Sequence, residues 1–369
     1  MSPLPVPDAD IRRATTPTGA LYTDPKVHSH QREVTLPSSW QFLGDDSPVR
    51  VPQQFIPLTF LEGSVDEPLL LTRDEQDQIH CISNVCTHRG ALVCEGAGNG
   101  RTLTCRYHGR RFNLDGTFKS MPEFDDACDF PRPEDDLAHV PLASWRQFLF
   151  ASMRPSLAFE ALTHDLDRLV GFLPIENATL DRSRSRDYLV RANWALYVEN
   201  YLEGFHIPFV HPGLADAIDY GEYRTELFAF ANLQLGIAAT DEDAFTLPTD
   251  HPMAGERVAA FYFWLFPNTM FNVYPWGISV NVVQPLAVDR TRVSFLSYVW
   301  DASRLDQGAG ADLDRVERED EAIIESVQRG LRSRLYPGGR YSPGREQGVH
   351  HFHRLLTSAM LDPDGRPDA

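Results

Sequence analysis

The chain has 369 residues, 42% of them hydrophobic, so it is long enough for two domains with separate cores. Its formal net charge of −18 disfavours binding to nucleic acid, because the phosphates would be repelled. No run of about 20 apolar residues predicts a membrane span, and the start of the chain lacks the layout of a signal peptide. We therefore expect a cytoplasmic protein that binds neither membrane nor nucleic acid.

The first half of the chain predicts a lead-in segment followed by an all-β domain. Residues 1–40 are rich in proline and polar residues, and we expect them to pack on the larger domain that follows. Residues 41–155 alternate short β-rich runs with turns, and Asp115-Gly116 is a strong hairpin-turn signal. The expected strands are Phe55–Leu58, Pro68–Thr72, Gln78–Ser83, Thr102–Thr104 and Gln147–Ala151.

Two loops of this domain carry cysteine and histidine pairs. Cys86 and His88 form the first pair, and Cys105 and His108 form the second pair after sixteen intervening residues. Two thiolates and two imidazoles are the ligands of a Rieske [2Fe–2S] cluster, in which two histidines replace two cysteines on one iron. The lower negative charge of this ligand set raises the reduction potential to roughly −150 to +300 mV. The four residues are therefore predicted to bind a Rieske cluster.

Zinc is the alternative metal for these four ligands, because two cysteines and two histidines also suit a tetrahedral structural zinc site. Zinc motifs usually place like ligands together, whereas each loop here supplies one cysteine and one histidine. This arrangement favours a cluster whose two irons differ in their ligands. The remaining cysteines, Cys81, Cys94 and Cys128, are odd in number, which argues against a disulfide framework.

Residues 156–369 predict a second, catalytic domain with an antiparallel sheet and two important helices. Consecutive strands without helices between them favour antiparallel pairing. The helices are expected from about Asn193 to His206 and from about Ala311 to Tyr336. The expected strands are Tyr223–Gly236, Val258–Phe266, Met270–Pro285 and Thr291–Trp300.

The first of these helices carries candidate metal ligands. Glu199, Glu203 and His206 are spaced four and three residues apart, so a helix would place them on one face. Pro208 is expected to end the helix, and the extended residues after it would bring His211 back toward His206. The two histidines then form half of a metal site, or else one is a core residue and the other a surface residue.

A carboxylate would complete the 2-His-1-carboxylate triad of mononuclear non-haem iron. The late helix offers Asp312, Asp314, Glu317, Glu319, Asp320, Glu321 and Glu325. Apolar residues, among them Ile323 and Val327, recur at helical spacing around Asp320. This pattern predicts that Asp320 points inward, that Glu321 and Glu325 point outward and that Glu317 lies at the edge of the apolar face. A charge on the inward face is costly unless it is paired or bound to a metal. Asp320 is therefore the predicted third ligand, with Glu319 as the alternative.

These segments together resemble the α subunit of Rieske non-haem iron oxygenases along the whole chain. Rieske proteins of respiratory and photosynthetic membranes carry an additional cysteine in each loop, whereas this chain has Tyr107 at the second of those positions. Arg110 departs from the oxygenase pattern, which most often has tryptophan there. The segments that most resemble the choline and carnitine monooxygenase branch are Phe266–Met270, Tyr274–Trp276 and Gly348–His353.

The resemblance implies an α+β fold, in which a small all-β Rieske domain is joined to a helix-grip domain made of an antiparallel sheet and a long helix. It also implies a head-to-tail homotrimer with one Rieske cluster and one mononuclear Fe(II) per chain. Glu203 matches the bridging acid of the family, which would join His108 of one subunit to an iron ligand of the next. Asn200 and Glu199 are expected to orient the iron site, or else to serve as ordinary hydrogen-bonding residues of the helix.

The function implied is that of a terminal oxygenase, which uses O2 to hydroxylate or demethylate a small organic substrate, with quaternary amines as a candidate class. Electrons from NAD(P)H would arrive through a separate flavin and iron–sulfur reductase or a ferredoxin, because the chain has no nucleotide-binding fingerprint. The alternatives are an aromatic ring-hydroxylating dioxygenase and a Rieske electron-transfer or redox-sensing protein.

Two further groups of residues in the second domain invite a functional interpretation. The tract Phe261–Phe266, with Tyr274 and Trp276, forms either an aromatic cage for a quaternary ammonium group or simply the core face of a sheet. The histidines at 350, 351 and 353 suggest a metal cluster, but strand-like alternation would place His350 opposite the other two. We therefore expect surface or pocket-lining roles for them.

Overall fold

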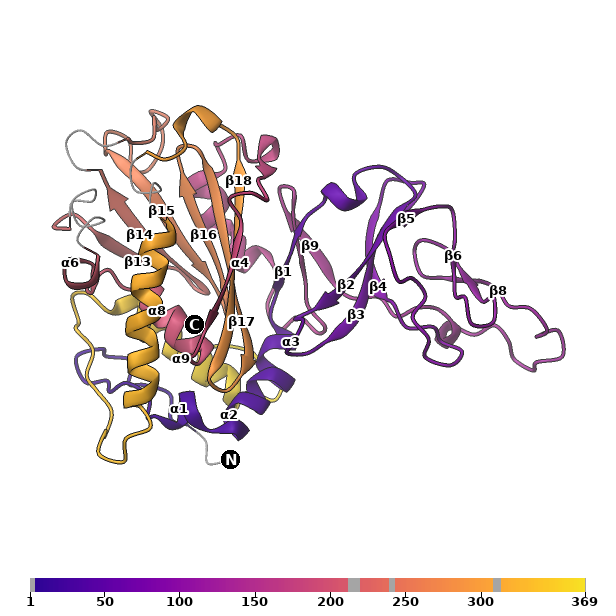
Figure 1. The fold of residues 1–369 in the computed structure, drawn as a ribbon, viewed down its shortest axis with the longest axis horizontal. Helices are drawn as coiled ribbons and strands as arrows, with labels where there is room; N and C mark the ends of the chain where they lie inside the picture. The colour runs from indigo at the N-terminus through magenta and orange to yellow at the C-terminus, as the bar shows by residue number, and fades with distance from the viewer. Residues whose placement is uncertain (1–3, 212–219, 239–242, 308–312, 369) are drawn as a thin grey trace. The chain divides into compact units, whose positions relative to one another are not determined.

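The computed structural model describes residues 4–211, 220–238, 243–307 and 313–368. It divides into two compact units (Figure 1), one formed by Trp40–Pro155 and the other by Met1–Ser39 together with Ser156–Ala369. The candidate acid Asp312 and the predicted helix start at Ala311 lie outside the described residues.

The smaller unit is built of three antiparallel sheets. The expected strands are confirmed, with shifts of one or two residues at their ends. Gly116, with a φ of 88°, makes the turn between β7 (Arg111–Phe112) and β8 (Phe118–Ser120). No disulfide links the five cysteines, all of which lie within the described residues. The first sheet contains β1 (Gln41–Asp45), β10 (Phe148–Ala151) and β9 (Leu142–Trp145). The second contains β4 (Ile79–Ser83), β3 (Glu67–Arg73), β2 (Gln54–Phe60) and β5 (Gly98–Asn99). The third contains β6 (Leu103–Thr104), β7 (Arg111–Phe112) and β8 (Phe118–Ser120).

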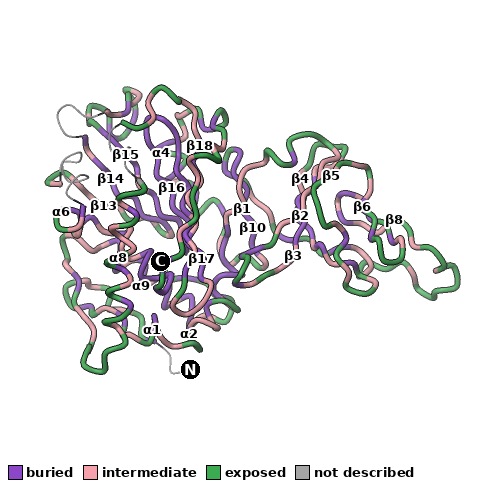
Figure 2. Tube along the Cα trace, in the orientation of Figure 1, coloured by how far each residue is buried: buried purple, intermediate pink, exposed green. Residues whose placement is uncertain are grey.

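The larger unit is organised around one eight-stranded antiparallel sheet. Its order is β11 (Thr179–Leu180), β18 (Arg290–Val299), β17 (Gly277–Ala287), β16 (Thr269–Tyr274), β15 (Val258–Leu265), β14 (Ala231–Ile237) and β13 (Arg224–Leu227), with β12 (Arg186–Val190) also paired to β18. Two of the predicted strands, over 223–236 and 270–285, are each a hairpin of two strands. Nearly every residue of the central strands is buried (Figure 2), so both faces of the sheet are covered.

Helices cover this sheet. Helix α5 (Trp194–Tyr201) packs against α8 (Leu313–Gly330), α9 (Gln347–Leu361) and β17, while α9 also packs on β13 and α4 (Glu160–Val170) on β15. The short helices are α1 (Ala20–Thr23), α2 (Pro25–His30), α3 (Leu36–Ser38) and α6 (Ile207–Val210). Together with the sheet, the long α8 confirms the expected helix-grip architecture.

The predicted helix over residues 193–206 is too long. Helix α5 ends at Tyr201, and a turn leads to α6, in which Pro208 occupies the first turn instead of ending a helix. At Gly204 a β-carbon would lie 2.5 Å from the ring of Tyr223, so the chain passes too close to that ring for a larger residue. Glu199 therefore does not share a helical face with His206, and its carboxylate lies 2.9 Å from His353 Nε2 instead.

The inward face of α8 also differs from the prediction. Glu317 is 3% exposed and not at the edge, whereas Ile323 and Val327 are 41% and 44% exposed. The orientation of the helix is set by polar contacts as much as by apolar ones. Tyr197 Oη donates to Glu317 Oε2 at 2.6 Å, and Gln328 Oε1 accepts from the Asn193 backbone N–H at 2.8 Å.

The histidines at 350, 351 and 353 lie on a helix, α9, so the alternation argument was wrong. Each has its own partner: His350 Nε2 lies 2.8 Å from the Asp8 carbonyl, and His351 Nδ1 lies 2.6 Å from Asn232 Oδ1. His353 is fully buried, and Tyr341 Oη lies 2.7 Å from its Nδ1. These contacts tie the helix into the fold.

Candidate functional site

The two loops with cysteine and histidine pairs have the same backbone design. Cys86 N–H donates to the carbonyl five residues later, and the N–H of Gly90 donates back to Cys86 at 2.9 Å. Cys105 and Gly109 repeat both bonds. Each glycine has a positive φ, 72° and 74°, which residues with a side chain rarely adopt. The glycines therefore let both turns place a cysteine toward the same interior.

Of the four predicted cluster ligands in the small unit, both cysteines are buried, His88 is half-buried and His108 is exposed. Cys86 and Cys105 are 3% and 1% exposed, and the rings of His88 and His108 are 4.7 Å apart. His88 Nδ1 is buried and has no hydrogen-bond partner. An imidazole nitrogen without a partner beside two buried thiols is the donor set that an iron–sulfur cluster requires. The residues present fit a Rieske cluster.

Arg110 packs behind these loops, where the family most often has tryptophan. It is 1% exposed, and its guanidinium lies 4.9 Å from the centre of the Phe118 ring and 5.5 Å from that of Phe130. Its charge is paired with Asp135 at 2.7 Å. Burial raises the pKa of the Cys86 thiol, and Arg110 partly counteracts that rise. The substitution thus keeps the aromatic packing and adds a cation beside the ligand loops.

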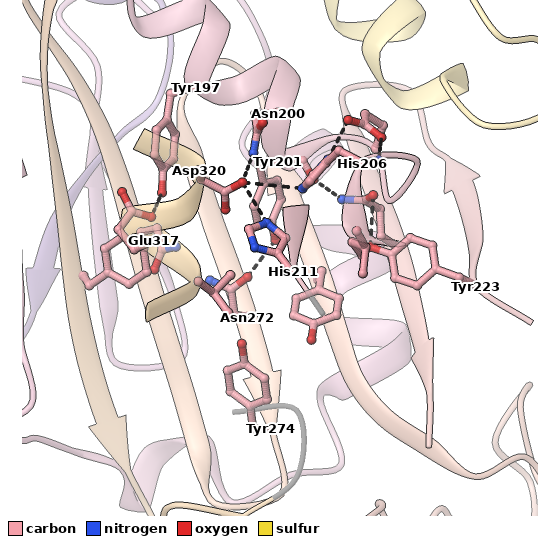
Figure 3. A pocket seen from close by; sticks show the side chains of 17 residues that line it. Tyr197, Asn200, Tyr201, His206, His211, Tyr223, Asn272, Tyr274, Glu317 and Asp320 are labelled. Atoms are coloured by element: carbon pink, nitrogen blue, oxygen red, sulfur yellow. Dashed lines mark hydrogen bonds and ion pairs between the residues drawn. The ribbon is translucent and has the colours of Figure 1, made fainter. Parts of the chain in front are cut away.

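In the large unit, His206, His211 and Asp320 converge (Figure 3) although more than a hundred residues separate the histidines from the acid. One ligand atom from each lies within 4.8 Å of the other two. Asp320 Oδ1 is 2.9 Å from His211 Nε2 and 3.5 Å from His206 Nε2. Two imidazoles and one carboxylate at this spacing fit a mononuclear iron with open positions. These are the three residues that the sequence predicts as iron ligands.

Neighbouring side chains hold these three groups in place. Glu203 Oε1 binds His206 Nδ1 at 2.6 Å, and Glu319 Oε2 binds His211 Nδ1 at 2.8 Å. Carboxylates on Nδ1 fix the rings with Nε2 toward a shared point, as in many metal sites. Glu319, the alternative third ligand of the sequence analysis, therefore sits behind His211 in this arrangement.

Asn200 joins the same group through Asp320. Its Nδ2 donates to Asp320 Oδ1 at 2.6 Å, so the amide orients the carboxylate. Burial alone would lower the pKa of His211, but Asp320 and Glu319 outweigh it and raise that pKa. The histidine thus lies in a field that favours a cation, which a metal ion can supply in place of a proton.

A cavity of about 120 Å³ opens beside the three residues and is walled by aromatic and amide side chains. A row of polar residues crosses the sheet there, because Gln234 pairs with Tyr262, Tyr262 with Asn272 and Asn272 with Ser279 on adjacent strands. The rest of the wall includes Tyr197, Tyr201, Tyr223, Tyr274, Asn281, Phe295, Val316 and Glu317.

Part of the aromatic tract Phe261–Phe266 lines the cavity, and part packs in the core of the sheet. Tyr262 and Tyr274 line the cavity, whereas Phe261 and Phe263 are fully buried on the other face of β15. Trp276 stacks behind Tyr274, with ring centres 5.2 Å apart. No place in a cavity wall was expected for Tyr201, Tyr223 or Glu317, although Glu317 was among the candidate iron ligands. The signal that could have identified several wall residues is the polar interruption of apolar strands at 234, 262, 272 and 281.

None of the helices in the described part of the chain combines the length and the apolar character that a membrane span needs.

Two family models match the chain. The Rieske [2Fe-2S] domain matches residues 39–141, and the ring hydroxylating alpha subunit (catalytic domain) matches residues 175–362. The second match covers half of the chain and contains the convergent histidines and Asp320. The first contains both loops with cysteine and histidine pairs.

Named relatives match along nearly the full chain. Choline monooxygenase, chloroplastic, from Arabidopsis thaliana is 30% identical, over 95% of this chain and 84% of the relative. The carnitine monooxygenase oxygenase subunit of Escherichia coli K12 is 29% identical over 96% of both chains.

Solved structures agree with these relatives. The quaternary ammonium Rieske monooxygenase CntA in complex with L-carnitine has a TM-score of 0.76 and 25% identity, over 97% of this chain and 99% of that one. Naphthalene 1,2-dioxygenase from Rhodococcus sp. has a TM-score of 0.72 at 18% identity, which shows a shared fold alone. The chain thus belongs to the Rieske non-haem iron oxygenases, as an α subunit with a Rieske [2Fe–2S] cluster and a mononuclear iron.

Proposed function

We propose that the chain is the terminal oxygenase of a system that hydroxylates or demethylates a small quaternary amine. The mononuclear Fe(II) would be held by His206, His211 and Asp320, and the triad would leave positions open for O2 on the bound iron. The Rieske cluster would be held by Cys86, His88, Cys105 and His108. The observation that carries the proposal is the convergence of His206, His211 and Asp320 at the edge of a cavity walled by tyrosines.

The reaction needs an external supply of electrons. Inserting one oxygen atom of O2 into a C–H bond forms one hydroxyl group and one water, and consumes two electrons and two protons. Rieske oxygenase α subunits take these electrons from a separate reductase. In this chain the proposed source is a flavin and iron–sulfur reductase or a ferredoxin, with NAD(P)H oxidised only on that partner.

Glu203 and Asn200 have proposed roles in the same chain of events. Glu203 binds His206 within the chain, and we propose that it also reaches the partner subunit's His108 in a head-to-tail homotrimer. An electron would then pass from the cluster of one subunit to the iron of the next. Asn200 would hold Asp320 in its ligating orientation.

The choice of a quaternary amine rests on two independent supports. Several tyrosine side chains line the cavity, and aromatic rings attract quaternary ammonium groups through the negative quadrupoles of their faces. Relatives that match along nearly all of this chain are named as choline and carnitine monooxygenases.

The test is oxygen uptake by the purified protein with a generic reductase and NADH. Quaternary amines should stimulate uptake and yield a hydroxylated or dealkylated product in step with O2 consumed, whereas aromatic acids should not. The iron content should be about three Fe per chain, compared with two for a Rieske electron carrier. Uptake driven by aromatic acids alone, or two Fe per chain in active protein, would contradict the proposal.

A further inference from the structure

One side chain of the cavity wall lacks a partner. Glu317 lies on α8 three residues before Asp320 and is 3% exposed. Its Oε2 accepts a hydrogen bond from Tyr197 at 2.6 Å, which Figure 3 shows beside the triad. Its Oε1 is buried and has no hydrogen-bond partner. A carboxyl group rarely stays buried with a free oxygen unless a ligand or water completes its contacts.

Other polar groups of the cavity satisfy one another. Gln234 Oε1 accepts from Tyr223 Oη at 3.1 Å, and Asn272 Oδ1 accepts from Tyr201 Oη at 2.9 Å. Among the lining residues in the described part of the chain, Glu317 alone has a buried polar atom without a partner. Glu203 and Asp320, the other lining acids in the described part of the chain, are paired with histidines, so Glu317 is the lining acid that a cation in the pocket can still pair with.

This acid and the aromatic side chains of the wall are complementary to an organic cation. Aromatic faces attract a cationic group, and a carboxylate supplies the opposite charge. A neutral hydrocarbon ligand would bury the carboxyl oxygen without giving it a partner, at a desolvation penalty. A ligand with a carboxylate at this position would be repelled.

We propose that Glu317 is the counter-ion for the positively charged group of the substrate and thereby sets the preference of the pocket for cations over neutral molecules. The inference deepens the proposed function, because it assumes that the substrate occupies the cavity beside the triad. Glu317 is a specificity-determining residue in this proposal and does not bind the iron. Three residues of helix, about 4.5 Å along the axis, separate it from Asp320.

The experiment compares the binding of choline with that of its uncharged carbon isostere, in which a tert-butyl group replaces trimethylammonium. Isothermal titration calorimetry on the iron-loaded protein measures both affinities in the wild type, Glu317→Gln and Glu321→Gln. Glu321 is the matched control, because it removes the same charge from the same helix but does not line the cavity.

In the wild type at about pH 8.5, where Glu317 is mostly ionised, choline should bind at least about tenfold more tightly than its isostere, since charge-assisted contacts exceed neutral ones by that amount. Glu317→Gln should reduce this preference to less than about threefold, whereas Glu321→Gln should retain it. Iron content and the visible spectrum of the cluster show whether each variant is intact.

Equal binding of choline and its isostere to the wild type would overturn the inference. This measurement needs no variant, so the inference can be tested even if Glu317→Gln fails to fold. An intact Glu317→Gln protein with the wild-type preference, or an equal loss in Glu321→Gln, would overturn it as well. Oxygen uptake is measured separately with the same ligands. Preferential choline binding without oxygenation would contradict the proposed function and not the role of Glu317.

Discussion

Arg110 and Asp135 form an ion pair against the Rieske ligand loops, with guanidinium Nη2 2.7 Å from Oδ1 of the acid. The arginine side chain is 2% exposed and the aspartate side chain 18%. Arg110 also donates to the backbone carbonyl of Asp135 at 2.9 Å, and the Thr87 hydroxyl donates to that carbonyl at 2.7 Å. The pair thus anchors the segment around residue 135 to the loop that carries Cys86 and His88.

Removing either charge of this ion pair should shift the reduction potential of the Rieske cluster, and the two shifts should be opposite in sign. A nearby cation stabilises the reduced, more negative cluster, so Arg110→Gln should lower its reduction potential, whereas Asp135→Asn should raise it. Arg110→Gln should also destabilise the domain by about 2 kcal/mol, less than for a fully enclosed pair because Asp135 is partly exposed. A redox titration and thermal unfolding measure the two effects. Shifts in the same direction for both variants would contradict the electrostatic account.

The two metal centres should be separable by mutation. His206→Ala or Asp320→Ala should remove about one of about three Fe per chain and abolish oxygenation. The visible Rieske spectrum should persist, because the cluster ligands come from a different unit of the chain. Metal analysis and absorption spectra test this expectation. A folded His206→Ala protein that has lost the cluster spectrum would refute the division.

Glu319 should affect iron affinity without being a ligand. Glu319→Gln removes the charge that holds His211 Nδ1, and iron binding should weaken by about 10- to 100-fold. Arg315→Gln is the matched control, since Arg315 touches the other oxygen of Glu319 and its side chain is 60% exposed. Competition with a chelator measures the affinities. Equal losses in both variants would indicate a general effect of charge on α8.

Glu203→Gln should slow electron transfer between the centres. The variant keeps the shape but loses the charge that orients His206, so Fe(II) is supplied in excess to keep the site loaded. The reductase should still reduce the cluster, while its reoxidation by O2 with substrate should slow by at least roughly tenfold. Stopped-flow absorption gives the rate. Reoxidation at the wild-type rate would show that Glu203 is an ordinary buried residue.

Cation binding should depend on pH through Glu317. The pKa of this carboxyl group is raised to about 8. Burial is the largest cause, the hydrogen bond from Tyr197 opposes the rise, and the charges of Asp320, Glu321 and Asp314 add to it. Below that pKa the group is neutral and must release a proton to pair with a cation. The affinity for choline should therefore rise with pH toward about 8 and then level off.

Calorimetry in buffers of different ionisation enthalpy checks this prediction, because proton release accompanies binding below the pKa. The uncharged isostere serves as the control and should bind with little pH dependence. A choline affinity that falls as pH rises from 6 to 8 would contradict this prediction.

The raised pKa of Glu317 also affects the stability of the fold. Because the carboxyl group ionises more readily in the unfolded chain, Glu317 should destabilise the folded state increasingly as pH rises from about 4.5 to about 8.

The sequence predicted best where ligands are local or have a distinctive chemistry. The pairs at 86 and 88 and at 105 and 108 are identifiable from spacing, because short turns hold each pair. Asp320 lies beside both histidines, as the predicted third ligand should, although the apolar face assumed for its helix includes the exposed Ile323 and Val327. Its neighbour Glu317 was misplaced because the contact with Tyr197, distant in sequence, helps to set how the helix is rotated.

The errors have the same physical origin. The break after Tyr201 depends on the close approach of Gly204 to the Tyr223 ring, which no local propensity contains. The wall of the cavity depends on the register of four strands, which brings Gln234, Tyr262 and Asn272 into one row. Alternation within each strand indicates such residues, but only the pairing of strands places them together.

Helix α8 also constrains how the chain can vary in length. Glu317, Asp320, Ile324 and Gln328 follow one another at intervals of three and four, so the pocket charge, the proposed metal ligand, a core contact and the link to Asn193 share a single line. Inserting or deleting one residue between them would rotate everything beyond that point by about 100°. Homologous chains should therefore differ freely in sequence on its solvent face but retain the same number of residues along this segment.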